Sequence, residues 1–158
     1  MDPLPLFVGQ FLWFLVVWSV VATVLVAPRL PEHDVDRRLA VWLTPQLFRV
    51  LGTGLLVPHL APDMPRAFAV PTAVGDTLTA GLALLALVAL HVRSRHARAL
   101  AWTCTILGSA DVTIALAHAA RIEAARYLAA QWYVATVMVP LMIVSHVMVF
   151  RTLLARRR

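Results

Sequence analysis

The chain has 158 residues, of which 61% are hydrophobic and 14% are charged, and its mean hydropathy is +0.80. Soluble domains are closer to half apolar and a quarter charged, so this composition excludes an ordinary soluble domain and indicates an integral membrane protein. Fourteen arginines against eight acidic residues, with no lysine, give a net charge of +6. In a soluble protein that charge would suggest a nucleic-acid partner, but the apolar excess excludes nucleic acid. A single cysteine, Cys104, excludes an internal disulfide framework and any cysteine-only metal site.

Five segments are apolar enough to predict transmembrane helices, each of which needs about 20 residues. They are residues 4–27, 40–58, 73–92, 99–119 and 131–150. We therefore expect an all-α integral membrane bundle of five transmembrane helices that forms a single domain over residues 1–158. The second segment is shorter than the others and carries Arg49, so an amphipathic helix lying on the membrane surface is the alternative for it.

The arginines indicate how the helices cross the membrane. With five spans and the N-terminus outside, ten arginines fall on the cytoplasmic side and three on the outer side. Cytoplasmic loops carry such an excess of positive charge. With four spans, residues 28–72 would instead put five arginines outside. We therefore expect an outer N-terminus and a cytoplasmic C-terminus in a multi-pass protein. The lack of lysine beside abundant Ala, Val, Leu and Arg is typical of a GC-rich bacterial genome, which suggests the bacterial inner membrane.

Polar side chains inside the expected helices gather in the outer half of the membrane. At about 1.5 Å per residue from the outer helix ends, four of them lie about 5 to 14 Å deep and two lie at the rim. Ionisable groups in hydrocarbon are costly, so they face the bundle interior or a wet cavity. The sequence therefore predicts an outer pocket with an apolar floor at Met138 and Met142, beside a kink at Pro140. The six residues expected to line it are Gln10, Arg49, Asp76, Asp111, His118 and Gln131.

Residue spacing on the fourth helix supports this pocket. Cys104, Asp111 and His118 recur every seven residues, so they lie on one stripe of an α-helix. The inner half of the membrane is poorer in polar groups, since we expect only His91 and His146 to approach the cytoplasmic edge.

On the second helix, Gln46, Arg49 and Thr53 are expected to share one face. Two interpretations of Arg49 stay open. It could form a bidentate pair with Asp111 that clamps two helices together, with Asp76 placed only to favour the positive end of its helix. Alternatively, the same groups line a pocket that binds a ligand or handles protons.

An enzyme that acts on a lipophilic substrate is the leading function. A carboxyl group in an apolar cavity can donate a proton to an alkene or epoxide, which leads to isomerisation, cyclisation or hydration of an isoprenoid-like molecule. Asp111 is the candidate acid because it lies deeper, and Asp76 or His118 would act as base or relay. Arg49 would set the charge state of the pocket or hold an anionic headgroup. The candidate substrate-binding residues are Arg49, Gln10, Gln131, Trp13 and Trp132.

Three other functions remain as alternatives. Haem could be ligated through His118 or His146, although no CxxCH attachment motif is present, so we expect neither a cofactor nor a metal. A proton-coupled transporter or permeation unit would require a homo-oligomer, because one chain of this length is too small for a pathway. A non-catalytic accessory subunit needs no reactive group. In every case the expected partners are membrane lipids and a lipophilic small molecule.

Overall fold

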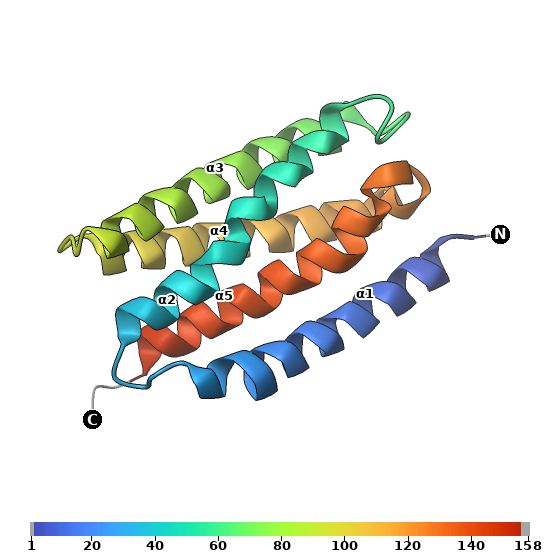
Figure 1. The fold of residues 1–158 in the computed structure, drawn as a ribbon. Coiled ribbons are helices and arrows are strands. Elements are labelled where there is room, and N and C mark those ends of the chain that lie inside the picture. The colour runs from blue at the N-terminus through green and yellow to red at the C-terminus, as the bar shows by residue number, and fades with distance from the viewer. Residues whose placement is uncertain (1, 156–158) are drawn as a thin grey trace.

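The computed structural model describes residues 2–155, which form five long helices and contain no strand. All five are long and apolar enough to cross a membrane, which confirms the predicted all-helical bundle with five candidate spans. Neighbouring helices alternate in direction, so the chain begins at one end of the bundle and finishes at the other (Figure 1). We call these the N-terminal end and the C-terminal end. The helices cover Leu4–Arg29, Val35–Leu56, Arg66–His91, Ala97–Arg121 and Ala129–Leu154.

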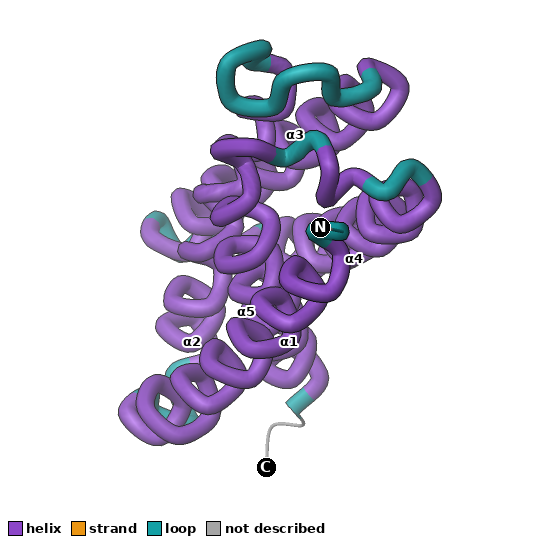
Figure 2. The backbone as a smooth tube through the Cα atoms, turned by 90° about the vertical axis from the view of Figure 1, so that its right-hand side faces the viewer, coloured by secondary structure: helices purple, strands orange, loops and turns teal. Residues whose placement is uncertain are grey.

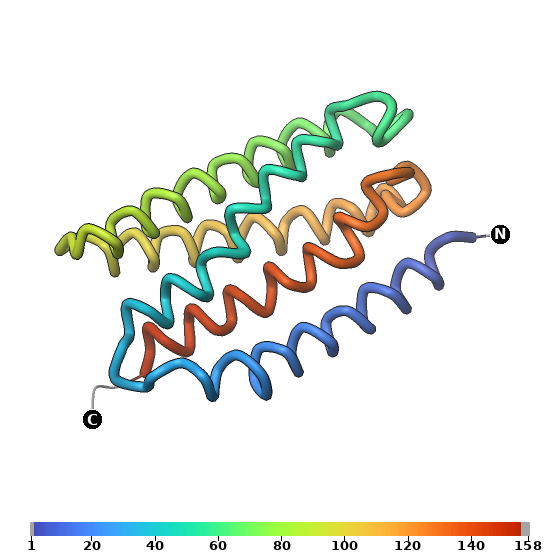
Figure 3. The backbone as a smooth tube through the Cα atoms, in the orientation of Figure 1, coloured from blue at the N-terminus to red at the C-terminus, as the bar shows by residue number. Residues whose placement is uncertain are grey.

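The first helix lies on the outside of the bundle. Its regular part, α1 (Leu4–Val20), buries no side chain and packs against α5 (Val139–Leu154) (Figure 3). The helix then widens into a π-helical segment, Val21–Val26, and ends in a 3₁₀ turn, Ala27–Arg29. Pro28 lies in that last turn and has no N–H to donate, so a change in the hydrogen-bond pattern at this point is expected.

The second helix changes type halfway. It begins as α2 (Val35–Leu43), where the Asp34 carboxylate accepts a 2.9 Å hydrogen bond from the backbone N–H of Arg37. It continues as a 3₁₀ helix, η3 (Thr44–Leu56), whose 2.0 Å rise stretches 13 residues over about 26 Å. This half packs mainly along α3 (Arg66–His91), inside the bundle. That position disfavours the alternative of a helix on the membrane surface.

The 3₁₀ geometry decides which side chains of η3 point inward. With three residues per turn, Gln46, Arg49 and Gly52 stack on one face, and all three are buried. The prediction that Thr53 shares this face is wrong because it assumed α-helical spacing. Thr53 is only partly buried, and its hydroxyl donates to the carbonyl of Val50, three residues earlier.

The third helix is longer than the sequence predicted. It begins at Arg66, directly after Pro65, rather than near residue 73. Its second turn includes Pro71, which removes one backbone hydrogen bond without ending the helix. A short turn then leads to α4 (Ala97–Arg121), which packs beside α3 along its length (Figures 1 and 2).

The fifth helix begins irregularly. A 3₁₀ turn, Ala129–Gln131, is followed by a π-helical segment, Val134–Met138, and then by α5. Pro140 is the second residue of α5, and the π-helical segment lies directly before it, where the missing N–H of the proline leaves a backbone carbonyl without its usual donor. The indole N–H of Trp18 on α1 donates a 3.0 Å hydrogen bond to the carbonyl of Val137, which ties the first helix to this irregular segment.

Two apolar clusters fill the bundle. The larger one lies toward the C-terminal end and includes Leu39, Leu43 and Val149, each with no exposed surface. The smaller one lies at the N-terminal end around Phe68 and Leu128. Along the second and third helices, Arg49 and Asp76 lie between the residues of these two clusters.

Candidate functional site

Arg49 is the centre of a buried ion-pair network. Its side chain is only 2% exposed, and its Nε donates to Asp76 on α3 at 2.9 Å. Its Nη2 binds the carboxylate of Asp111 on α4, and its Nη1 donates to the backbone carbonyl of Gly108 at 3.1 Å. One guanidinium group therefore joins three helices and is shared by two carboxylates.

Glycines make room for the polar side chains around this network. A Cβ atom at any of four glycines would overlap the functional group of a facing side chain. The two remaining glycines, Gly9 and Gly81, have nothing within 4 Å of such an atom. These four glycines are therefore the feature of the sequence that could have located the site, because each lies against a polar side chain of a neighbouring helix. The four pairs are Gly52 with Asp76, Gly54 with Gln131, Gly75 with Asp111, and Gly108 with His146.

His146 belongs to this network, although the sequence predicted it near the cytoplasmic edge. It is 3% exposed, and its Nε2 lies 3.5 Å from Nη1 of Arg49. The prediction was wrong because α5 continues to Leu154 rather than ending near residue 150, which places His146 a full turn deeper. Its Nδ1 has no hydrogen-bond partner among the described residues.

A second buried polar group, Gln46, was missed as a site residue. Its Nε2 donates to the carbonyl of Met142 at 3.0 Å and to the hydroxyl of Ser145 at 2.8 Å. That hydroxyl in turn donates to the carbonyl of Trp42. Gln46 lies one 3₁₀ turn before Arg49, so these bonds extend the polar row and join the second helix to α5.

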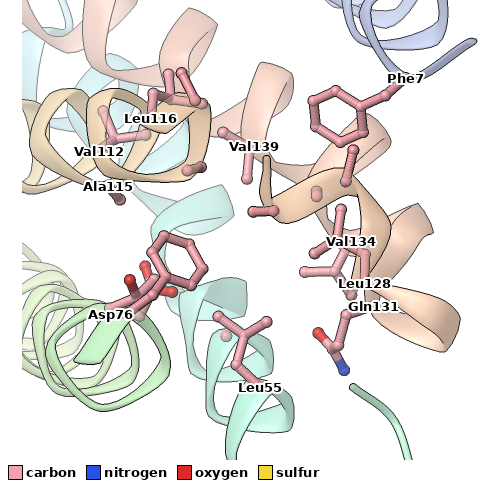
Figure 4. Close-up of a pocket in the computed structure, with 18 of the residues that line it drawn as sticks. Phe7, Leu55, Asp76, Val112, Ala115, Leu116, Leu128, Gln131, Val134 and Val139 are labelled. Carbon is pink, nitrogen blue, oxygen red and sulfur yellow. The ribbon is translucent and has the colours of Figure 1, made fainter. Parts of the chain in front are cut away.

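A cavity of about 300 Å³ lies beside the network, between α1 and α4 at the N-terminal end of the bundle (Figure 4). Asp76, Arg49 and Gly52 line its inner end. The exposed lining residues Leu4 and Glu123 lie where α1 begins and α4 has ended, so the cavity opens there. Its walls are mostly apolar, from side chains that include Phe7, Leu55, Phe68, Val112, Leu116, Leu128, Val134 and Val139.

The structure brings together only some of the predicted site residues. Asp76, Arg49 and Gln131 line the cavity, as does Met142, whereas Asp111 is absent from the lining and binds the far side of the guanidinium. Gln131 is 7% exposed, and its backbone N–H donates to the carbonyl of Leu60 at 3.3 Å. Met138, expected in the floor, is not part of the lining.

The other predicted residues lie outside the cavity lining. His118 packs edge-on against Phe68, with ring centroids 5.5 Å apart. Gln10 accepts a 2.6 Å hydrogen bond from the indole N–H of Trp132, and this pair joins α1 to the start of the fifth helix. Trp13 is 67% exposed on the outer face of α1 and contributes nothing to the cavity wall.

His118 and His146, the two histidines considered as haem ligands, lie at different heights in the bundle. Among residues 2–155, no three His, Cys, Asp or Glu side chains are grouped so that they could hold a metal ion. His146 faces Gly108, which is ten residues before His118 on α4, so the two candidate haem ligands are about 15 Å apart along that helix.

The chain belongs to a family described as a domain of unknown function, DUF8737, whose family model matches residues 6–154. No curated protein and no solved structure matches the chain.

Proposed function

We propose that this DUF8737 protein is a multi-pass protein of the bacterial inner membrane that binds a lipophilic small molecule in the cavity between α1 and α4. The arginines support a cytoplasmic C-terminal end, since seven in the described residues lie there and three lie at the N-terminal end. In this orientation the cavity opens toward the outer surface of the membrane.

The observation that carries the proposal is an apolar cavity that ends on a partly buried carboxylate, that of Asp76. Its volume of about 300 Å³ lies at the lower limit of small-molecule sites, which combine apolar walls with a few placed polar groups. Asp76 is such a group, since its side chain is 15% exposed and is held by Arg49. A ligand tail would contact Phe7, Phe68 and Leu116, and its polar head would reach Asp76.

Acid–base chemistry at Asp76 is the reaction that this arrangement supports best. When a protonated Asp76 meets an alkene, its O–H bond breaks while the alkene π pair forms a new C–H bond, which leaves a carbocation beside the carboxylate. Return of a neighbouring proton to Asp76 gives isomerisation. Attack by a second alkene, followed by loss of a neighbouring proton to Asp76, gives cyclisation, and attack by water, followed by loss of one water proton to Asp76, gives hydration. Asp111 and Arg49 act as positioning residues, because Arg49 uses its N–H groups to hold both carboxylates.

Transport is less well supported. A substrate path through one chain would have to continue past Arg49 into the C-terminal half, where Leu39, Leu43 and Val149 belong to a closely packed apolar cluster. The cavity is lined only by residues of the N-terminal half and the middle of the bundle. Its shape therefore favours binding from one side.

Photo-crosslinking tests ligand binding directly. A diazirine-bearing isoprenoid alcohol, added to the protein in lipid nanodiscs, should label the cavity wall, and mass spectrometry should locate the adduct near Leu55, Phe68 or Leu116. Leu116→Trp fills the cavity and should abolish this labelling. Ile114→Trp is the matched control, because Ile114 is 68% exposed on the same helix and should leave labelling intact. Equal labelling of both variants would contradict the proposal.

Deuterium exchange tests the acid–base step. In D₂O, reversible protonation of an isoprenoid alkene replaces neighbouring C–H hydrogens with deuterium, so mass spectrometry should detect incorporation with the wild-type protein. Asp76→Asn should remove incorporation while retaining crosslinking. Incorporation that survives Asp76→Asn would show that Asp76 is not the acid.

A further inference from the structure

We propose that the inner end of the cavity is a cation site, selective for lipophilic ligands whose head is positively charged and donates hydrogen bonds, such as alkylammonium ions. This inference rests on the proposed ligand binding and specifies which head group the cavity accepts. A carbocation formed at Asp76 carries the same charge, so an amine would also act as a stable mimic of that species.

The net charge at the inner end of the cavity favours a cationic ligand. Arg49 is the only cationic residue among the described lining residues, and two carboxylates, those of Asp76 and Asp111, share it. When both carboxylates are ionised, the three side chains carry one net negative charge in an apolar setting. A cation at Asp76 would neutralise that charge, whereas an anionic head would add to it.

The hydrogen bonds that Arg49 already makes disfavour an anionic ligand. Nε donates to Asp76, Nη1 to the carbonyl of Gly108, and Nη2 to Asp111. With 2% of its surface exposed, the guanidinium presents no free edge to the cavity. A carboxylate or phosphate head would have to displace one of these bonds, so Arg49 does not provide an anion site.

The side-chain oxygen of Gln131 independently supports a ligand head that donates hydrogen bonds. It lines the cavity and is 7% exposed, yet its side-chain oxygen has no hydrogen-bond partner among the described residues. Its amide packs against Gly54, two residues beyond the Gly52 that faces Asp76, and Figure 4 shows Asp76 and Gln131 at separate places on the cavity wall. An ammonium N–H would supply the bond that this oxygen lacks.

The size of the cavity suggests suitable probes. A cavity of about 300 Å³ is at the small end of the range for ligand sites, so short single-chain molecules are suitable probes. Decylamine, decanol, decanoate and decane have matched chains and differ only in the head group. Decylamine is almost fully protonated at neutral pH.

Equilibrium binding of the four probes to wild-type protein in zwitterionic nanodiscs, corrected with empty nanodiscs, tests the inference. We expect decylamine to bind at least tenfold more tightly than decanol, and decanoate to bind most weakly. If decanol or decane binds as tightly as decylamine, or decanoate binds more tightly, the cation site is refuted while the lipophilic cavity stands. If none of the four probes binds, the proposed function itself fails.

Variants then assign the selectivity to residues. Asp76→Asn should weaken decylamine binding at least tenfold and leave decane binding unchanged, and Gln131→Leu should weaken decylamine binding several-fold. Asp36→Asn is the control, because it removes the same charge from an exposed pair with Arg98 at the other end of the bundle. Unchanged decylamine affinity in both cavity variants would overturn the proposal. If Asp76→Asn does not fold, the wild-type selectivity series and Gln131→Leu decide the question.

Discussion

Gly52 lies directly against the carboxylate of Asp76, so the space that a side chain at position 52 would need is already occupied. The 3₁₀ geometry of η3 places Gly52 one turn after Arg49 on the same face. The glycine therefore lets Asp76 approach the helix closely enough for its 2.9 Å ion pair with Arg49. The charge network depends on backbone shape as well as on charged residues.

Gly52→Ala should destabilise the protein by about 1 to 3 kcal/mol, because the added methyl group displaces the Asp76 carboxylate from a packed site. Gly81→Ala is the matched control, since nothing lies within 4 Å of its added Cβ atom. In the middle of a helix that change should be neutral or stabilising by up to about 1 kcal/mol. Denaturant unfolding in detergent measures both variants, and equal stabilities would contradict the packing argument.

Arg49→Ala should be among the most damaging single substitutions. It leaves two carboxylates in the bundle without their cation, and breaking a buried ion pair costs about 3 to 5 kcal/mol. Arg49→Lys should not fully restore stability, because a lysine cannot bond to Asp76, Asp111 and Gly108 at once with a planar fork.

A double-mutant cycle separates pairing from general damage. Asp111→Asn in the Arg49→Ala background removes one of the two stranded charges, so the double variant should be more stable than Arg49→Ala alone. Thermal unfolding of the wild-type protein, both single variants and the double variant measures this coupling. Strictly additive losses would mean that Arg49 and Asp111 do not stabilise one another.

Trp18→Phe should cost about 1 kcal/mol, because it removes the hydrogen bond to the Val137 carbonyl while retaining an aromatic ring. α1 buries none of its residues, so this bond is one of its few specific links to the bundle. Trp13→Phe is the control, since Trp13 is 67% exposed on the same helix. Hydrogen exchange of α1 should increase for Trp18→Phe and remain unchanged for Trp13→Phe.

Sequence patterns predicted the five helices well because a long apolar run is a strong signal. Helix boundaries were harder to predict. The third helix was predicted to begin at residue 73, yet α3 begins at Arg66 and includes Pro71, since one proline near a helix start removes only one bond. The 3₁₀ character of η3 could not be predicted from hydropathy, and it brought Gly52 rather than Thr53 onto the Arg49 face.

The candidate site shows the same division between composition and geometry. The sequence identified Arg49, Asp76 and Asp111 as site residues because they are ionisable residues within apolar segments, where an unpaired charge is costly. Depth counting could not find the contact between Arg49 and His146, because it depends on how far α5 extends and on the space at Gly108. Trp13 was predicted to bind substrate but lies outside the cavity lining. The sequence does not show which face of a predicted helix an aromatic residue occupies.

The orientation of the bundle can be tested by labelling single introduced cysteines with a membrane-impermeant maleimide in intact bacterial cells. Glu32, His59 and Ala130 are exposed sites in the loops and helix ends that follow the first, second and fourth spans. Asp63 and Glu123 are less suitable because their positive φ values of 60° and 52° disfavour cysteine. The wild-type protein is the blank, since Cys104 has no exposed surface.

We expect positions 59 and 130 to react in intact cells and position 32 to react only after lysis. The reverse pattern would invert the bundle and put the cavity on the cytoplasmic side, while reaction of positions 32 and 59 from one side would remove the second helix as a span.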